Sequence, residues 1–317
     1  STVNNRDMRD IITKATYKLL VLVGDSYQIA SIRFGNWFSV ARAFVPEASV
    51  FELTKPYRSN NAGLLTLWDR VRKMDDTILE LITRQGYSAT LDVSIFAPAE
   101  ADEIILCLNY DGLYGINNIN RFLQESNPSF AVPWGIQQYK VNDPILFNES
   151  DRFAPVIYNN MKGRIVGIEI LDSEKPTERI QFDIELDKVI NGVDAFDQDF
   201  ELLESAESGN SVIRFCVNKL KSTDEDDDDS SKAVVPFQVA YAVSIHKAQG
   251  LEYNSVKIVI TDEIDELITH NIFYTAITRA RNKLKIFWTP EVEQKVLSSI
   301  KPKNSNKDVQ LLKNNNQ

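Results

Sequence analysis

Two stretches near the end of the chain combine polar and basic side chains with turn-forming residues. Residues 244–253 read SIHKAQGLEY, and residues 274–281 read YTAITRAR. Between them, residues 256–261 form a β-branched run that predicts a buried strand. A polar loop before a strand, and a helix carrying two arginines after it, predict a ligand at the end of a sheet. A phosphate group suits this combination.

The composition is that of an ordinary soluble globular protein, with 43% hydrophobic and 25% charged residues in 317. No apolar run approaches the ~18–20 residues of a membrane span, so we expect no membrane contact. The polar start shows no signal peptide. Cys107 and Cys216 are the only cysteines and lie in apolar runs. This usage predicts buried free thiols and a cytoplasmic location.

The net charge of −10 argues against a nucleic-acid binder, because such proteins tend to be basic. Six consecutive acidic residues at 224–229 predict a solvated loop over residues 221–233. Without that loop the remainder is only mildly acidic. A locally basic cleft is therefore compatible with the composition, because the field that steers a polyanion is local.

The first 130 residues alternate between strand-like and helix-like patterns. Apolar runs predict buried strands at residues 19–23 and 104–108, and residues 49–53 predict a further strand between them. Apolar periodicity predicts helices at residues 5–16, from residue 34, and at residues 64–74 and 114–123. This alternation predicts an α/β fold built on a parallel sheet.

The pattern changes between residues 137 and 235. The apolar runs become short, and several alternate with period two between Asn, Asp and Gly turns. They predict a small antiparallel sheet or barrel inserted into the α/β part, whose pattern resumes at residue 236. The Lys/Asn-rich residues 301–317 predict a flexible tail.

These pieces, in this order, resemble the C-terminal half of a superfamily 1 helicase of the RecD-like (superfamily 1B) type. The resemblance rests on residues 24–28 (GDSYQ) for motif III, 57–59 (YRS) for motif IV, 244–252 for motif V and 274–281 for motif VI. Residues 139–144 and 158–163 are similar to the opening of the SH3-like barrel that these helicases carry.

The resemblance implies a RecA-like parallel-sheet domain with an inserted SH3-like β-barrel, preceded by the tail of a first RecA-like domain. It places that tail at residues 1–47 and the second RecA-like domain at residues 48–136 and 236–300. The barrel then occupies residues 137–235.

No GxxxxGK[ST] loop and no Asp-Glu pair suited to Mg²⁺ occur in the chain. Ser1 and Thr2 look like the end of motif II, so we expect a fragment that begins just after the Walker B acid. The implied cofactors, ATP and Mg²⁺, would then require an upstream domain. We expect the fragment alone to be inactive and to hold no metal site of its own.

Phosphoryl transfer needs positive charge at the γ-phosphate, and arginine offers a permanent charge with a bidentate fork. The resemblance assigns this role to Arg58 and Arg279. It assigns Gln28 to sensing the γ-phosphate or orienting the water. The residues expected beside the nucleotide are Gln249, Gly250 and Glu252, with Glu252 near the ribose or the metal waters.

The resemblance assigns strand binding to Ser244, His246 and Lys247, whose polar groups suit phosphate oxygens. Phe34 follows motif III, where a ring can stack on a base. Asn117 is a further candidate contact to the sugar–phosphate chain. Single-stranded DNA is the expected partner, ahead of RNA.

Each assignment has a structural alternative. Arg58 suits a surface ion pair, Arg281 a structural position, and His246 a loop-stabilising one. The aromatic cluster that includes Phe34 suits a core. A non-motor regulatory module that binds a protein partner through the barrel is the rival to an ATP-dependent translocase, and an RNA helicase is a third reading.

The barrel gives mixed signals. Lys140, Lys162 and Arg164 are candidate contacts to single-stranded DNA. Three acidic residues on the predicted strands would repel a phosphate chain, namely Asp183, Glu185 and Asp187.

Overall fold

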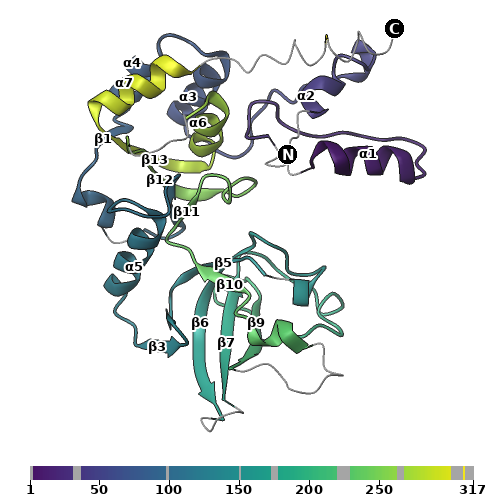
Figure 1. The fold of residues 1–317 in the computed structure, drawn as a ribbon, viewed down its shortest axis with the longest axis vertical. Helices are drawn as coiled ribbons and strands as arrows, with labels where there is room; N and C mark the ends of the chain where they lie inside the picture. Colours follow the sequence, from purple (N-terminus) through teal and green to yellow (C-terminus); the bar gives the residue numbers. More distant parts are fainter. Residues whose placement is uncertain are drawn as a thin grey trace. The chain divides into compact units, whose positions relative to one another are not determined.

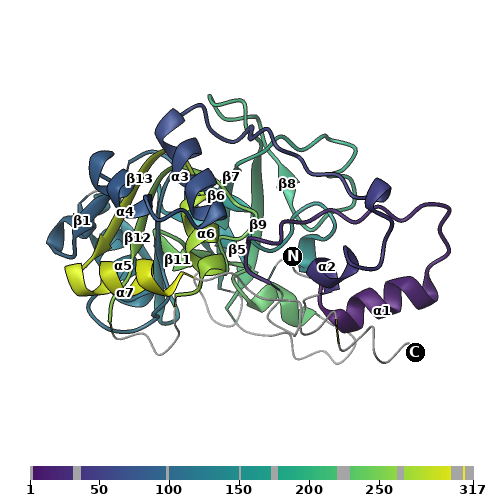
Figure 2. The same cartoon turned by 90° about the horizontal axis from the view of Figure 1, so that it is seen from above.

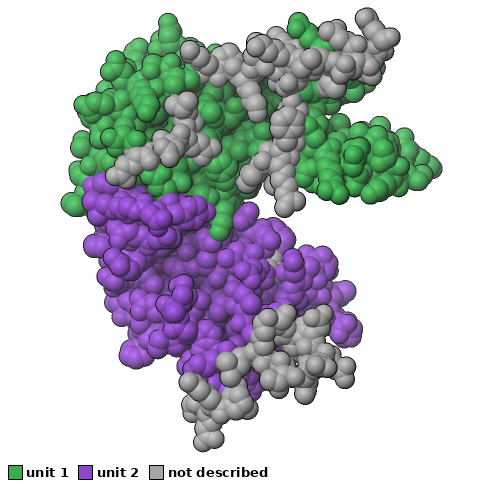
Figure 3. All heavy atoms as spheres, in the orientation of Figure 1, with its two compact units in different colours: residues 1–95, 100–109, 244–317 green, residues 96–99, 110–243 purple. Residues whose placement is uncertain are grey.

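The computed structural model describes residues 3–30, 37–97, 100–149, 151–172, 178–219, 229–262, 268–300 and 310. The chain forms two compact units (Figure 3). Unit 1 comprises residues 1–95, 100–109 and 244–317, and unit 2 comprises residues 96–99 and 110–243. Phe34 and residues 221–228 of the predicted acidic loop lie outside the described residues. The predicted domain boundaries stay predictions.

A five-stranded sheet, whose first four strands belong to unit 1, has the order β1-β13-β12-β2-β11 (Figure 1). These strands are β1 (Ser88–Thr90), β13 (Ala280–Trp288), β12 (Tyr253–Val259), β2 (Glu103–Cys107) and β11 (Ala242–Ser244). β13 pairs in parallel with both β1 and β12, and β12 pairs in parallel with β2. All five residues of β2 are buried, as its apolar run predicts. The α/β prediction is confirmed.

Two helices pack together against β13 (Figures 1 and 2). α3 (Ala62–Lys73) buries an i, i+3, i+4, i+7 stripe of Leu64, Leu67, Trp68 and Val71. The Asn61 side chain caps its first turn by accepting from two backbone N–H groups. α6 (His270–Ile277) lies beside it, and Trp68 Nε1 donates to the Ile277 carbonyl at 3.1 Å. This contact joins α3 to the last turn of α6.

The remaining helices of unit 1 are α1 (Asn5–Lys14), α2 (Trp37–Ala41), α4 (Ile78–Arg84) and α7 (Pro290–Ser299). Short 3₁₀ turns are η1 (Glu47–Ser49) and η2 (Val93–Phe96). The predicted helices at residues 5–16 and 64–74 are confirmed to within two residues. For the helix predicted from residue 34, the described part is α2.

Two predicted strands are wrong. Residues 19–23 form no strand, and Leu19, Val21 and Val23 are 69–81% exposed. Residues 50–53 are also irregular, with Phe51 and Leu53 86% and 90% exposed. An apolar run supplies only the side chains of a strand. A strand also needs a neighbouring backbone to pair with, and neither segment has one among the described residues.

The arginines of residues 274–281 do not lie on a helix, contrary to the prediction. α6 ends at Ile277, where Thr278 Oγ1 donates back to the Tyr274 and Thr275 carbonyls. Arg279 follows in the connection, and Arg281 lies in β13. Pairing of β13 with β12 competes with helix continuation here, and the sheet pairing prevails.

Unit 2 contains a six-stranded antiparallel sheet in the order β10-β5-β6-β7-β9-β8. Its strands are β10 (Phe237–Val239), β5 (Pro144–Phe147), β6 (Lys162–Leu171), β7 (Arg179–Leu186), β9 (Val212–Asn218) and β8 (Glu201–Leu202). Buried aromatic rings fill its core, including Phe147, Phe153, Phe182, Phe215 and Phe237. The antiparallel sheet is confirmed. Closure into an SH3-like barrel stays a prediction.

The other elements of unit 2 are α5 (Ile116–Ser126) and the hairpin of β3 (Ala131–Trp134) and β4 (Gln137–Lys140), with the 3₁₀ turns η3 (Asp151–Phe153) and η4 (Asp229–Ala233).

The buried carboxylate of Asp143 joins the rest of unit 2 to the six-stranded sheet. Asp143 is fully buried and accepts hydrogen bonds from Gln124 Nε2, Asn127 Nδ2 and the Tyr241 hydroxyl at 2.6–2.9 Å. These donors supply the hydrogen bonds that a buried carboxyl group requires.

Candidate functional site

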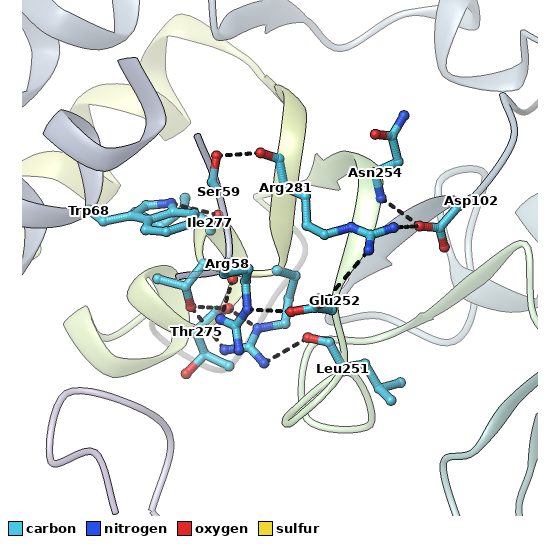
Figure 4. A network of polar contacts seen from close by, with 12 residues as sticks. Arg58, Ser59, Trp68, Asp102, Leu251, Glu252, Asn254, Thr275, Ile277 and Arg281 are labelled. Carbon is cyan, nitrogen blue, oxygen red and sulfur yellow. Dashed lines mark hydrogen bonds and ion pairs between the residues drawn. The ribbon is translucent and has the colours of Figure 1, made fainter. Parts of the chain in front are cut away.

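Three residues far apart in sequence lie at the same edge of the sheet because each immediately precedes a parallel strand. Asp102 precedes β2, Glu252 precedes β12, and Arg279 precedes β13. Tyr253 pairs with Ala280, and Ser255 with Glu103, so the amino ends of these strands lie side by side. The charged cluster drawn in Figure 4 therefore gathers at the amino ends of the strands.

Arg58 reaches this cluster from the segment before α3. Its Nε donates to Glu252 Oε2 at 3.0 Å, and its Nη1 donates to the Thr278 carbonyl at 2.7 Å. The side chains of Arg58 and Glu252 are 28% and 44% exposed. The neighbouring Ser59 hydroxyl donates to the Arg281 carbonyl, which fixes the segment against β13 (Figure 4). Arg58 is thus held in place yet partly open to solvent.

Arg279 is fully buried. Its Nε donates to the Thr275 carbonyl at 2.8 Å, Nη1 to the Leu251 carbonyl at 2.9 Å and Nη2 to Thr278 Oγ1 at 3.0 Å. Burial, with a smaller contribution from the nearby Arg58 charge, lowers the pKa of Arg279 to about 10, although Asp25 partly opposes this. Two guanidinium groups at close range make a place where an added anion is favoured.

Arg281 completes the cluster through two carboxylates. Its Nη2 lies 2.5 Å from Asp102 Oδ2, and its Nη1 lies 3.6 Å from Glu252 Oε1. Glu252 thus has one oxygen facing Arg58 and the other facing Arg281 (Figure 4). Asp102 and Thr278 were absent from the sequence-based candidates. Parallel strand register alone brings Asp102 here, and no motif marks it.

The segment that resembles motif III is attached to α6. Asn271 Nδ2 lies within 2.9–3.2 Å of the carbonyl oxygens of Ser26, Tyr27 and Gln28. Next to it, the Ile29 N–H donates to Thr275 Oγ1 at 3.0 Å. Asn271 and Thr275 are also missed by sequence reasoning. Their four-residue spacing on α6 places both on the side facing this segment.

Gln28 is half-buried, and its Nε2 donates to Asp25 Oδ2 at 3.0 Å. Asp25 also accepts from the Tyr27 N–H at 2.9 Å, so it shapes the turn that carries Gln28. Tyr274 lies nearby. Burial, together with the Asp25 charge, raises the pKa of Tyr274 to about 12.

The loop between β11 and β12 begins at the carboxyl end of β2, where the Ile245 N–H donates to the Cys107 carbonyl at 3.1 Å. Ser244 is buried, and its Oγ accepts from the Lys247 N–H at 3.2 Å. His246 and Lys247 are half-buried. Ser244 therefore stabilises the turn, while the two basic side chains lie nearer the surface.

Gln249 and Gly250 differ in their surroundings. Gln249 Nε2 donates to the Ile29 carbonyl at 3.0 Å, so this side chain also holds the motif III segment. Gly250 is exposed with a φ of +88°, a conformation that favours glycine, and no atom lies within 4 Å of the place of a Cβ. A ligand could approach the backbone closely at this position.

Asn117 belongs to unit 2. It is exposed, its Nδ2 donates to Asp111 Oδ1 at 3.1 Å, and it lines an open pocket of about 470 Å³ with Arg121. Asn120 instead clasps the backbone of Ala242, accepting from its N–H at 2.8 Å and donating to its carbonyl at 2.9 Å. Asn120 thus holds the strand that leads into the 244–252 loop.

Phe34 lies outside the described residues, but its aromatic neighbours are described. Trp37 Nε1 donates to the Val3 carbonyl at 2.7 Å, and its ring meets Phe38 edge-on at 5.6 Å. Phe38 carbons lie 3.0 Å from the place of a Cβ on Gly24, so only a glycine fits there without displacing the ring. Trp37 and Phe38 are both half-buried, so they contact neighbouring groups of the protein without being core residues.

The candidate cations of the antiparallel sheet are all engaged. Arg164 pairs with Glu185 at 2.6 Å, and Lys162 with Asp187 at 2.9 Å. Asp183 is engaged by Arg214 in two hydrogen bonds of 2.7 Å. Lys140 is buried and donates to the Asn127 carbonyl at 2.8 Å. Each acidic residue expected to repel a phosphate chain is thus paired with a cation, Asp183 with Arg214, Glu185 with Arg164 and Asp187 with Lys162.

Within the described ranges, no helix is both long and apolar enough to cross a membrane. The same residues contain no group of three or more His, Cys, Asp or Glu side chains arranged to hold a metal ion. Cys107 is buried, as predicted, whereas Cys216 is only half-buried, and both are free thiols.

Comparison with known proteins first indicates the class of protein to which this chain is similar. The family model of the UvrD-like helicase C-terminal domain matches residues 239–286, which include the 244–252 loop and two arginines of the cluster, Arg279 and Arg281. The crystal structure of Pif1 helicase from Candida albicans superposes on 92% of this chain and 67% of its own, with a TM-score of 0.50 and 14% sequence identity. That likeness concerns the fold.

Sequence relatives then narrow the class. The RecD subunit of the RecBCD enzyme from Buchnera aphidicola subsp. Acyrthosiphon pisum is 22% identical over 292 residues, 80% of this chain. RecD from Buchnera aphidicola subsp. Schizaphis graminum is 24% identical over 195 residues, 59% of this chain. The chain spans 41% and 25% of the length of these relatives. The resemblance to the C-terminal portion of superfamily 1, RecD-like helicases is confirmed.

Proposed function

We propose that the chain supplies the C-terminal half of an ATP-dependent translocase, or helicase, on single-stranded DNA. Arg58 and Arg279 would act on the nucleotide phosphates, and the 244–247 loop would contact the strand. The observation that carries this proposal is the convergence of Arg58, Glu252 and Arg279 at the amino ends of β12 and β13. Similarity to RecD sequences over 80% of the chain supports it.

The two arginines would divide the work. Arg58 is 28% exposed, so its remaining N–H groups can reach a phosphate without rearrangement of its neighbours. Arg279 is fully buried behind backbone partners, so its charge would act from a short distance through a poorly screening interior. We therefore assign direct phosphate contact to Arg58. Arg279 would add positive charge behind Arg58. It would contact the phosphate only after its hydrogen bond to the Leu251 carbonyl is broken.

Gln28, Gln249 and Gly250 would line the rest of the nucleotide site. Gln28 lies on the segment held by Asn271, so its position is coupled to the helix that leads into Arg279. Gln249 acts on the same segment through the Ile29 carbonyl. Gly250 leaves its backbone open for close approach. ATP would bind together with Mg²⁺. The P-loop and the Mg²⁺ ligands would come from outside these 317 residues.

His246 and Lys247 are the proposed strand contacts, because both are half-buried on the loop that follows β11. Ser244 would act indirectly by fixing the turn through the Lys247 N–H. The charge-compensated face of the antiparallel sheet contributes little attraction for phosphates. We also propose that this sheet closes into an SH3-like barrel and helps to guide DNA. The proposed contacts of the 244–247 loop do not depend on either point.

ATP hydrolysis tests the half-site proposal. We expect the purified 317-residue chain to show no ATPase activity, with or without single-stranded DNA, because it contains no P-loop sequence. Hydrolysis by the wild-type chain that Arg279→Ala abolishes would contradict the proposal. That variant separates intrinsic activity from a contaminating ATPase, since a contaminant is unaffected by the substitution.

A further inference from the structure

The Glu252 carboxylate lies between two guanidinium groups. Its Oε2 is 3.0 Å from Arg58 Nε, and its Oε1 is 3.6 Å from Arg281 Nη1. Asp102 binds the far side of Arg281 at 2.5 Å. The four side chains form a row of alternating charge, Arg58, Glu252, Arg281 and Asp102, which Figure 4 shows in full.

The contact between Arg58 and Glu252 is open to replacement by a ligand. Both side chains are reached by solvent, with 28% and 44% exposed. Ion pairs that water reaches are weak, because water competes for both charges. A phosphate group carries more charge than a carboxylate and accepts from an arginine fork at two oxygens. It therefore competes well for the Arg58 guanidinium.

Arg58 keeps its place when that contact is lost. Its Nη1 donates to the Thr278 carbonyl at 2.7 Å, and this bond is independent of Glu252. The Ser59 hydroxyl also holds the backbone through the Arg281 carbonyl. Loss of the Glu252 contact therefore frees the charge of Arg58 without freeing its position. Glu252 in turn still faces Arg281, so its own charge stays paired.

We propose that Glu252 is a positioning residue that occupies Arg58 in the absence of nucleotide, and that a terminal phosphate takes its place. Arg281, held by Asp102, then retains the released carboxylate. This inference rests on the proposed phosphate role of Arg58. It gives Glu252 a part other than the ribose or metal-water contact expected from the sequence, and it makes Arg281 a positioning residue rather than a phosphate ligand.

Inorganic tripolyphosphate is the appropriate probe, because it has the phosphate chain of a nucleotide but no ribose and no base. Its binding to the 317-residue chain is measured by isothermal titration calorimetry. We expect Glu252→Gln to tighten binding roughly two- to fivefold, the range that corresponds to one half-exposed ion pair. The gain should vanish in the double variant Arg58→Ala/Glu252→Gln, since there is then no arginine to release.

Asp102→Asn is the matched control. It removes the same charge from the same row, but Asp102 makes its ion pair with Arg281 and not with Arg58. If Asp102→Asn increased the affinity for tripolyphosphate as much as Glu252→Gln does, the cause would be the loss of one negative charge from the site in general. That result would overturn the inference. Unchanged or weaker tripolyphosphate binding by Glu252→Gln would also overturn it. Circular dichroism confirms that each variant is folded.

Arg58→Ala distinguishes failure of the Glu252 inference from failure of the proposed function. Weaker binding by Arg58→Ala, without a gain in Glu252→Gln, removes the inference and leaves the proposed function intact. Equal binding by Arg58→Ala and the wild type, or no binding by the wild type, contradicts the phosphate role of Arg58 itself. The inference falls with it.

Discussion

Asn271 Nδ2 lies 2.9 Å from the backbone oxygen of Gln28. The same nitrogen approaches the two preceding carbonyls, so one amide in the first turn of α6 contacts three successive residues of the chain. The segment that resembles motif III is thereby joined to the helix that leads into Arg279. The two are therefore linked by hydrogen bonds as well as by the connecting chain.

Asn271→Ala should loosen this junction. Without the amide, three carbonyls lose a donor, and the Thr275 hydroxyl and Gln249 remain as the partners of residue 29. We expect amide hydrogen exchange of residues 26–29 to accelerate about tenfold, the effect of losing roughly 1–1.5 kcal/mol of hydrogen bonding. Exchange measured by mass spectrometry checks this.

Asn118→Ala serves as the control for that experiment. It removes an amide that donates to the Leu113 carbonyl in unit 2, and it should leave exchange at residues 26–29 unchanged. Equal exchange in the wild type and Asn271→Ala would show that the three carbonyl contacts contribute nothing to holding the segment.

Arg279→Lys should destabilise the protein although it keeps the charge. A lysine has no planar fork and cannot reach the Thr275 carbonyl, the Leu251 carbonyl and Thr278 Oγ1 in the same geometry. Buried acceptors left without donors cost about 1–3 kcal/mol. Urea unfolding of both proteins measures the loss.

The matching substitution Arg281→Lys should cost less than about 1 kcal/mol, because Arg281 is 39% exposed and water can replace its partners. If Arg279→Lys were as stable as the wild type, the three hydrogen bonds would not be what fixes Arg279, and its burial would need another explanation.

Glu185 should make stability depend on pH in the acidic range. Burial alone raises its pKa, but hydrogen bonds from Arg164 and Ser208 outweigh this and hold the pKa below its ordinary value. A carboxyl with a lowered pKa stabilises the folded state at neutral pH. That stability is lost as the pH falls through the folded-state pKa.

The wild type should therefore exceed Glu185→Gln in unfolding free energy by about 0.5–1 kcal/mol at pH 7, and the gap should close below the ordinary glutamate pKa. Thermal unfolding at a series of pH values gives both curves. Glu125→Gln, an exposed position on α5, should follow the wild-type curve. A gap that stayed constant down to acidic pH would argue against an ionised Glu185 as its source.

Periodicity was sufficient to predict the elements that bury a complete face. The stripe of α3 and the apolar run of β2 each specify a core-facing surface by themselves. Periodicity was insufficient at residues 19–23, because a strand is defined by its neighbour as well as by its side chains. The same limit explains why Arg279 was expected on a helix rather than beside a strand.

The candidate site was partly accessible to sequence reasoning. Motif resemblance identified Arg58, Glu252 and Arg279, which the structure brings together. It gave no sign of Asp102 or Asn271, because their role depends on strand register and on which face of α6 meets residues 26–29. It also gave no sign that Arg279 is fully buried, which depends on tertiary packing.

The central claim is that this chain contacts single-stranded nucleic acid through the 244–247 loop. Filter binding of oligothymidylate over a range of salt concentrations tests it most directly, with oligouridylate measured in parallel. We predict a linear fall of log affinity with log salt, tighter binding of the DNA strand, and a slope about 0.7 shallower for Lys247→Ala, one phosphate contact. Lys73→Ala, which removes a surface partner of Asp69, should keep the wild-type slope. Absence of binding, or a Lys247→Ala slope equal to that of the wild type, would contradict the claim.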